Sequence, residues 1–219
     1  MLLFGDAVGE PGEHPARTAP QPDVVPLVVI DRPTEQSHVA VGWRGLPAGD
    51  DDRYALWVAN HVLGGGMSSR LFQEIREERG LAYTVFSSPS SYSDVGSLMI
   101  YSGTTPSRLG ELLEVIDSVI DGLVADGITE EEHRVALGYL EGSMLLGLVD
   151  SGSRMARLGS GLTNRDEVVS VEEHVGRIRA VTPADVSRVL HQVFDGPRAV
   201  AAVGPLGGGT PALDAFARG

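Results

Sequence analysis

The sequence predicts an α+β fold, a mostly antiparallel sheet covered on one face by helices. Turn-bounded runs rich in β-branched residues indicate two strands, and after one helix two more strands follow. Helical periodicity fills most of the remaining chain before a last short strand. Such segregated runs are typical of α+β proteins rather than of alternating βα units. The expected strands cover 27–30, 37–43, 82–88, 95–103 and 198–203, with a Ser/Pro turn at 88–94.

The helix between the strand pairs has clear boundaries. It covers 54–63 and leads into three glycines, Gly64–Gly66. Ser68 or Ser69 can cap a second, short helix with one apolar face. Gly80 is expected to end that helix, because glycine readily takes the left-handed conformation found at helix C-termini.

The second half of the chain is predicted to be helical. Thr129 and Ser170 begin capping-box patterns, in which a hydroxyl and an acidic residue three positions later satisfy free backbone N–H groups. Pro106 follows a threonine and opens another helix. The expected helices cover 109–123, 129–148 and 151–161, followed by one from 170 and one over 182–193.

Composition divides the chain into one domain with two extensions. Residues 1–23 are rich in glycine and proline and lack apolar periodicity, which predicts a linker or extended segment. The domain is expected over 24–204, and the glycine-rich end over 205–219 is expected to be a flexible tail. A chain of 219 residues is long enough for one large hydrophobic core.

Charge and cysteine content exclude several classes of function. The net charge of −13 disfavours binding to the phosphates of nucleic acid. With no cysteine, the chain has neither disulfides nor thiolate metal sites. No apolar run approaches the ~20 residues of a membrane helix. These features predict a cytoplasmic protein that binds neither nucleic acid nor membrane.

Residues 63–83 carry the most informative pattern, LGGGMSSRLFQEIREERGLAY. It reads as a helix end, a glycine loop, a short amphipathic helix and the start of a strand. The run resembles, almost letter for letter, an element in the C-terminal, non-zinc half of the pitrilysin and mitochondrial processing peptidase family of zinc metallopeptidases. The resemblance covers about 24–204, with softer support at 152–159 and 181–186.

In that family an arginine and a tyrosine, in the pattern R-x6-Y, reach the zinc site of the other half. Arg76 and Tyr83 fit this pattern. The resemblance implies that Arg76 orients the substrate backbone and that Tyr83 helps to stabilise the tetrahedral intermediate. It also places Gly64, Gly65 and Gly66 in a loop that lines the substrate chamber.

Spacing alone favours a plainer interpretation of the same residues. Arg76 would be a solvated helix charge and Tyr83 a half-buried strand aromatic, with the competing Arg79 facing solvent. The glycine triplet precedes a helix, as phosphate-binding loops do, but it lacks the Gly-Lys-Ser/Thr ending. Its plain alternative is a sharp, close-packed turn.

The zinc motif of the family, H-x-x-E-H, is absent from this sequence. At the comparable place the helix carries Trp57, Asn60 and His61, so one imidazole remains where a catalytic zinc needs three protein ligands. We therefore expect His61 to be structural, this chain to hold no metal, and the zinc to belong to the partner half. A cluster of Glu130, Glu132 and His133 is better explained by the capping box than by a metal site.

The resemblance implies that the chain is the C-terminal, substrate-binding half of a zinc endopeptidase. Its partner would be an N-terminal zinc-binding half or a homologous H-x-x-E-H subunit, and its substrate a peptide. By itself the chain is expected to be inactive. An isolated half with an open chamber face is also expected to self-associate. The alternative is a non-catalytic scaffold or peptide-binding relative of the same family.

Overall fold

The computed structural model describes residues 25–207 and 210–218, so the predicted linker over 1–23 lies outside the described residues. The strands are β1 (Leu27–Asp31), β2 (Ser37–Gly45), β3 (Ala82–Ser91), β4 (Gly96–Thr104) and β5 (Ala199–Gly204). The helices are α1 (Arg53–Leu63), α2 (Leu109–Asp126), α3 (Glu130–Gly147), α4 (Ser151–Arg165), α5 (Val171–Arg179), α6 (Pro183–Phe194) and α7 (Pro211–Arg218). Two short elements join them: a π-helix, η2 (Phe72–Glu78), and a 3-10 helix, η3 (Pro106–Arg108).

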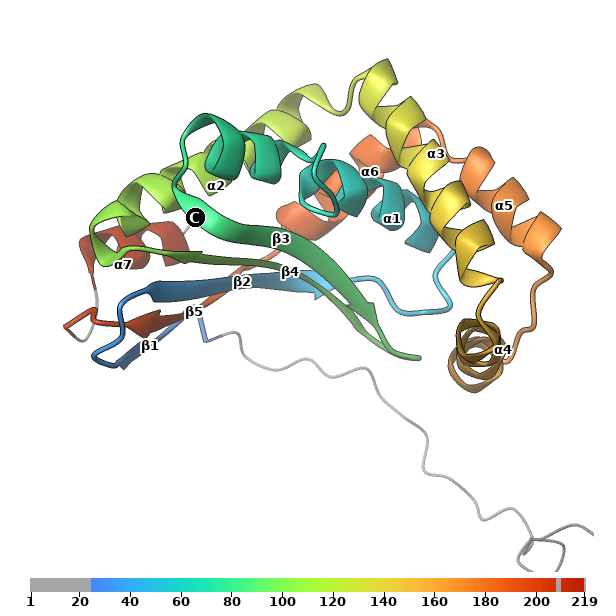
Figure 1. Ribbon diagram of the computed structural model, residues 1–219, viewed down its shortest axis with the longest axis horizontal. Coiled ribbons are helices and arrows are strands. Elements are labelled where there is room, and N and C mark those ends of the chain that lie inside the picture. Colours follow the sequence, from blue (N-terminus) through green and yellow to red (C-terminus); the bar gives the residue numbers. More distant parts are fainter. Residues whose placement is uncertain (1–24, 208–209, 219) are drawn as a thin grey trace, which may run out of the picture.

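The strands form one sheet in the order β1-β5-β2-β4-β3. Only the β1–β5 pair is parallel, and the other neighbours are antiparallel. Most of the helices lie above one face of this sheet, and α4 lies beyond its end (Figure 1). The predicted α+β fold, mostly antiparallel with helices on one face, is therefore confirmed.

The alternation of side chains along β2 shows which face is covered. Val39, Val41 and Trp43 are buried and point toward the helices. Trp43 meets Phe194 of α6 edge to face, with the ring centroids 5.0 Å apart. Full burial of each such apolar side chain contributes roughly 1.5–3 kcal/mol. This one-sided core holds the sheet to α1, α2 and α6.

The other face of the sheet, here called the open face, has no helix of the described residues over it (Figure 1). The strand register gives its residues in two central rows. One row runs Val28, Ala201, Ala40, Tyr101 and Phe86, and the next runs Ile30, Val203, His38, Gly103 and Thr84. None of these residues is Asp, Glu, Lys or Arg. In a chain of net charge −13, the two central rows of the open face are thus uncharged, and the exposed Arg44 lies on this face near the end of β2.

The tail prediction over 205–219 is wrong, because α7 occupies much of it. Leu213, Phe216 and Ala217 of this helix are buried, and the Arg198 guanidinium lies 4.6 Å from the centre of the Phe216 ring. Their spacing of three and four residues makes one apolar helix face, and α7 packs against α2, β1 and β5. The domain therefore continues beyond residue 204.

Several local signals differ from expectation. The capping box at Thr129 is confirmed, whereas Ser170 only accepts a hydrogen bond from the Glu173 backbone. Ser69 does not cap the short helix, because its hydroxyl donates to the Gly66 carbonyl instead. The turn expected at 88–94 is shorter, since β3 runs to Ser91. Proline is tolerated there because β3 is an edge strand.

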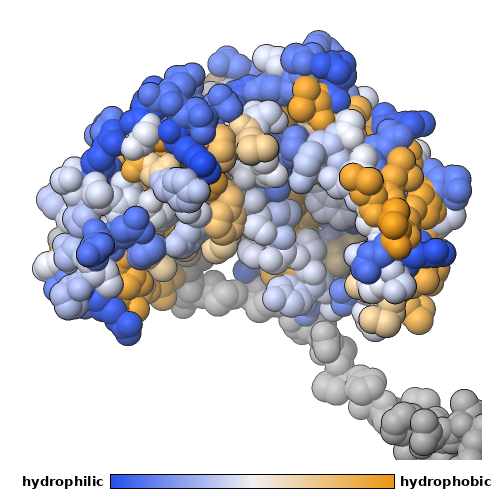
Figure 2. Space-filling view, in the orientation of Figure 1, coloured by the Kyte–Doolittle hydropathy of each residue, from blue (hydrophilic) through white to orange (hydrophobic). Residues whose placement is uncertain are grey.

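The helical layer exposes apolar side chains at its far end. Apolar surface gathers over α3 and α4 at the right of Figure 2. The exposed apolar side chains of this surface, here called the α3–α4 patch, are Leu145, Leu146, Val149, Met155, Leu158 and Leu162. Monomeric soluble proteins rarely expose contiguous apolar patches without a binding role.

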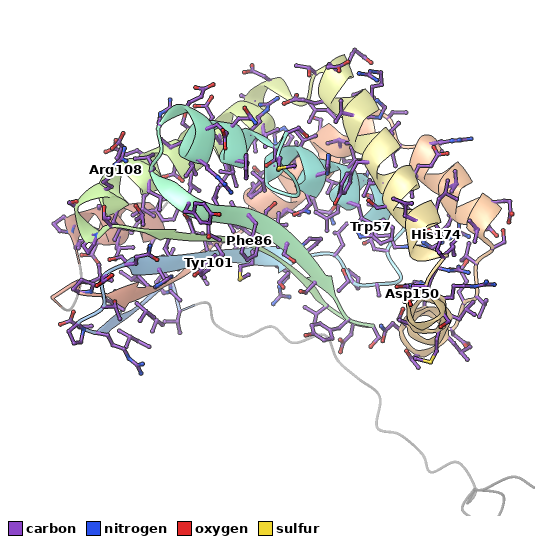
Figure 3. All side chains as sticks on the ribbon, in the orientation of Figure 1. Trp57, Phe86, Tyr101, Arg108, Asp150 and His174 are labelled. Carbon is purple, nitrogen blue, oxygen red and sulfur yellow. The ribbon has the colours of Figure 1, made fainter. Side chains whose placement is uncertain are left out.

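A buried polar cluster joins α5 to α1. His174 packs against Tyr54 and Trp57, with ring centroids 5.3 and 6.1 Å apart (Figure 3). Burial lowers the pKa of His174 to about 4, and the nearby guanidiniums of Arg165 and Arg157, together with those of Arg53 and Arg177, act in the same direction. The imidazole is therefore neutral in the folded protein at neutral pH.

The packing of α7 predicts the effect of truncating its central side chain. Leu213→Ala should lower the free energy of unfolding by about 2–5 kcal/mol, because it leaves a cavity between the helix and the sheet. Urea unfolding followed by circular dichroism measures this change. Asp214→Ala, at the neighbouring exposed position, is the matched control and should change stability little. Equal stability of both variants would show that α7 does not belong to the core.

The neutral state of His174 predicts an acid-sensitive fold. The unfolded chain binds a proton at this residue near pH 6.5, whereas the folded chain binds it only near pH 4. Stability should therefore fall as the pH drops from 6.5 to 4, and this loss should stop below that window. Urea midpoints measured across the window should fall more steeply in the wild type than in His174→Gln. Parallel slopes would contradict the prediction.

Candidate functional site

The structure brings the two predicted site residues together. Arg76 lies in η2 and Tyr83 at the start of β3. The guanidinium carbon of Arg76 is 4.4 Å from the centre of the Tyr83 ring and 4.8 Å from that of Phe72. Arg76 is thus held between two aromatic rings, an arrangement that stabilises a cation through the ring faces.

Both residues occupy irregular backbone. Arg76 lies in a π-helix, a rare form that is frequent at functional sites. Tyr83 lies at a β-bulge, because the register with β4 shifts between Ala82 and Thr84. A bulge turns a side chain away from its regular direction. As a result Tyr83 is 77% exposed, rather than half-buried as the plainer interpretation expects.

The turn between the two residues is tight. Gly80 has a φ of 55°, in the left-handed region that glycine adopts without strain. The Leu81 N–H donates to the Ile75 carbonyl at 2.7 Å, which closes the end of η2. Ile75 and Leu81 are both buried, so the turn is fixed from the core side while Arg76 and Tyr83 face outward.

The polar atoms of the pair remain available. Arg76 has one charged neighbour, Glu77, with 3.5 Å between Nε and the carboxylate. Across the described residues, neither its guanidinium nor the Tyr83 hydroxyl makes a hydrogen bond to the protein. Arg79, the competing arginine, pairs with Glu74 and Glu78 instead. The pair therefore offers several unused donors next to one another at an exposed edge.

The glycine loop is a close-packed turn. The Ser87 N–H of β3 donates to the Gly64 carbonyl at 3.0 Å, and a Cβ on Gly64 would lie 2.6 Å from that nitrogen. A Cβ on Gly66 would press on the His61 ring at 3.1 Å. These contacts explain why side chains are absent here. They join the loop to β3 four residues beyond Tyr83.

The α1 residues at the comparable place of the zinc motif do not fit a metal. Asn60 accepts a hydrogen bond from the Ser87 hydroxyl at 2.7 Å. His61 is buried and stacked on Tyr139, with ring centroids 4.2 Å apart, and burial lowers its pKa. Trp57 packs against His174. No group of three or more His, Cys, Asp or Glu side chains among the described residues could hold a metal ion.

The acidic start of α3 has a structural explanation. Glu132 completes the capping box with Thr129 and pairs with Arg70 at 2.7 Å. His133 Nε2 lies 2.9 Å from the Val181 carbonyl.

Among the described helices, none is long and apolar enough to cross a membrane.

Sequence reasoning missed Phe72 and the backbone irregularities. Phe72 precedes Arg76 by four residues, a helical spacing that places two side chains on the same face. That spacing could have predicted the contact between Phe72 and Arg76. The bulge at Tyr83 had none, because it depends on the register with β4, a strand distant along the chain.

Comparison with known proteins gives consistent results. A family model described as the Peptidase M16 inactive domain matches residues 3–138. An uncharacterized zinc protease of Streptomyces coelicolor is 43% identical over 178 residues, covering 81% of this chain and 39% of that protein. One of Bacillus subtilis is 40% identical over 174 residues, covering 80% of this chain and 42% of that protein. The chain thus spans well under half the length of these relatives.

The solved structures agree on the fold. A peptidase M16 inactive domain from Pseudomonas fluorescens superposes with a TM-score of 0.74 at 23% identity, over 84% of this chain and 45% of that one. A protease from Helicobacter pylori gives a TM-score of 0.76 at 20% identity, over 82% and 44% of the two chains. By sequence and by fold, this chain belongs to the M16 peptidase family and corresponds to its inactive domain.

Proposed function

We propose that this chain is the substrate-binding half of a zinc endopeptidase and completes an active site whose zinc is held elsewhere. The observation that carries the proposal is the pair of a half-buried Arg76 and an exposed Tyr83, whose donors make no hydrogen bond to the described protein. Apart from the ion pair of Arg76 with Glu77, the polar groups of this arginine and tyrosine are unused by the described protein, which suits a ligand better than a structural role.

The chemistry of peptide hydrolysis suits these two donors. Attack on a peptide carbonyl turns its oxygen into an oxyanion, and a preorganised hydroxyl can donate to it. Tyr83 would supply that hydroxyl while keeping its proton. The planar guanidinium of Arg76 would hold backbone carbonyls of the substrate through two N–H groups. Stacking on Phe72 and Tyr83 limits its rotation, so less entropy is lost on binding.

The zinc would come from a partner. Trp57, Asn60 and His61 serve packing and hydrogen bonding within this chain. The relatives that are named zinc proteases are more than twice as long as the matched segment. We infer that an N-terminal half, or a homologous H-x-x-E-H subunit, supplies the metal. The α3–α4 patch supports the existence of such a partner, because apolar surface of this kind is usually covered in an assembly.

The open face would form the wall of the substrate chamber. Its central rows carry no charged side chain, and they include the rings of Phe86, Tyr101 and His38. The Phe86 and Tyr101 centroids lie 5.3 Å apart, and the Tyr101 hydroxyl shares a 2.7 Å hydrogen bond with His38 Nδ1. Such a surface suits uncharged segments of an unfolded peptide. Gly64–Gly66 would form part of the chamber rim, where Gly65 and Gly66 are half-buried.

The proposal predicts activity only from the assembled halves. A quenched fluorescent peptide should be hydrolysed by this chain mixed with its H-x-x-E-H counterpart, and by neither alone. Tyr83→Phe should lower kcat roughly a hundredfold, the usual effect of removing one oxyanion donor. Arg76→Ala should raise KM as well, because it removes contacts to the substrate backbone.

The control is Arg179→Ala, which removes an exposed arginine paired with Glu141 far from the site. This variant should keep full activity. Assembly of every variant with the zinc-binding half is checked by size-exclusion chromatography. Equal activity of the zinc-binding half with and without this chain, or full activity of both site variants in assembled pairs, would favour the alternative of a scaffold or peptide-binding relative.

A further inference from the structure

Three successive carbonyl groups between Arg76 and Tyr83 receive hydrogen bonds from one short segment of the chain. Arg108 donates from Nη2 to the Arg79 carbonyl at 3.0 Å and from Nη1 to the Gly80 carbonyl at 2.7 Å. The Thr104 hydroxyl donates to the Leu81 carbonyl at 2.6 Å. The donors come from the end of β4 and from η3, more than twenty residues along the chain from the turn.

These three hydrogen bonds satisfy the backbone carbonyls of the turn. The carbonyls at a helix C-terminus have no partner within the helix, so they need other donors. A planar guanidinium can serve two adjacent carbonyls at once, which fixes both distance and direction. Glu111 lies 3.6 Å from the Arg108 guanidinium and helps to orient it. Arg108 stands at the end of the sheet where β3 begins (Figure 3).

Thr104 also belongs to the bulge itself. It is the β4 partner of Ala82, and the register shift that displaces Tyr83 starts at that pair. The side chain is almost fully buried, at 2% exposure. Thr104 therefore holds two consecutive residues just before Tyr83: Leu81 at the end of the turn, and Ala82 at the first position of the strand.

We propose that Thr104 and Arg108 are positioning residues of the Arg76–Tyr83 pair. They touch neither side chain of the pair and act by fixing the three carbonyls that set the angle between η2 and β3. This inference rests on the proposed function for its effect on catalysis, whereas its structural part is measurable without a substrate. The displacement of a catalytic group by about 1 Å can lower a rate roughly a hundredfold.

The structural part is tested by hydrogen exchange on the full chain. Arg108→Ala should speed amide exchange in the peptide that covers 79–84 at least tenfold and leave the helices of the core unchanged. Arg108→Lys keeps the charge but loses the bidentate hydrogen bonding. Its amide exchange rate at 79–84 should lie between those of the wild type and Arg108→Ala. Arg134→Ala removes an exposed arginine paired with Glu131 and is the matched control. Unchanged exchange at 79–84 in Arg108→Ala would overturn the inference.

The catalytic part is tested in the complex with the zinc-binding half. Arg108→Ala and Thr104→Val should each lower kcat about tenfold or more with little change in KM, and Thr104→Ser should restore it because the hydroxyl returns. In a Tyr83→Phe background, Arg108→Ala should have a clearly smaller further effect, since part of its action on catalysis passes through Tyr83. Full additivity of the two losses would overturn the positioning role.

The two proposals fail in different ways. If Tyr83→Phe leaves activity intact, the proposed function is wrong, and hydrogen exchange still decides whether Arg108 holds the turn. If Tyr83→Phe is inactive while Arg108→Ala and Thr104→Val are fully active, the proposed function stands and the positioning role is wrong. Circular dichroism of each variant separates these outcomes from simple unfolding.

Discussion

The packing of helices against only one face of the sheet is the constraint on which the remaining structure depends. Trp43 and the buried valines of β2 anchor this layer, and α6 meets it through Phe194. Because all large apolar side chains of β2 point to one side, its other side carries His38, Ala40, Gly42 and Arg44 and stays open. The strand order then leaves β3 at the edge, where Tyr83 reaches solvent.

Regular structure would not bring Arg76 and Tyr83 into this position. In a plain strand Tyr83 would have a cross-strand partner, but the bulge leaves it unpaired. Both the π-helix and the bulge weaken local hydrogen bonding, which destabilises the backbone. The neighbouring residues compensate: Leu71, Ile75 and Leu81 are buried on the core side. The irregular segment is thus held by its apolar residues while its polar residues remain free to act.

Much of the fold follows from patterns that are local in the sequence. Period-two and helical spacings located the main strands and helices, and the box at Thr129 formed as its residues predict. The structure places Arg76 next to the Tyr83 ring, and the role of this pair as a site stays a prediction. What escaped prediction depends on contacts between distant segments. The bulge requires the register with β4, and the turn requires donors from Thr104 and Arg108. The α7 helix was missed because only its packing on the domain distinguishes its short apolar face from a tail.

Helix α1 supports the proposal that hydrolysis would need a partner domain. A metal-binding helix must expose its ligands in a common cavity, whereas here Asn60 bonds to Ser87 and His61 stacks on Tyr139. To bind a metal, the His61 ring would have to leave Tyr139 and also lose its packing against Gly66. The observed packing of His61 therefore opposes a role as a metal ligand. The two side chains of the proposed site could orient a substrate and stabilise charge, but neither arginine nor tyrosine readily accepts a proton near neutral pH. In the proposed function, the acid–base step of peptide cleavage would therefore come from outside this domain.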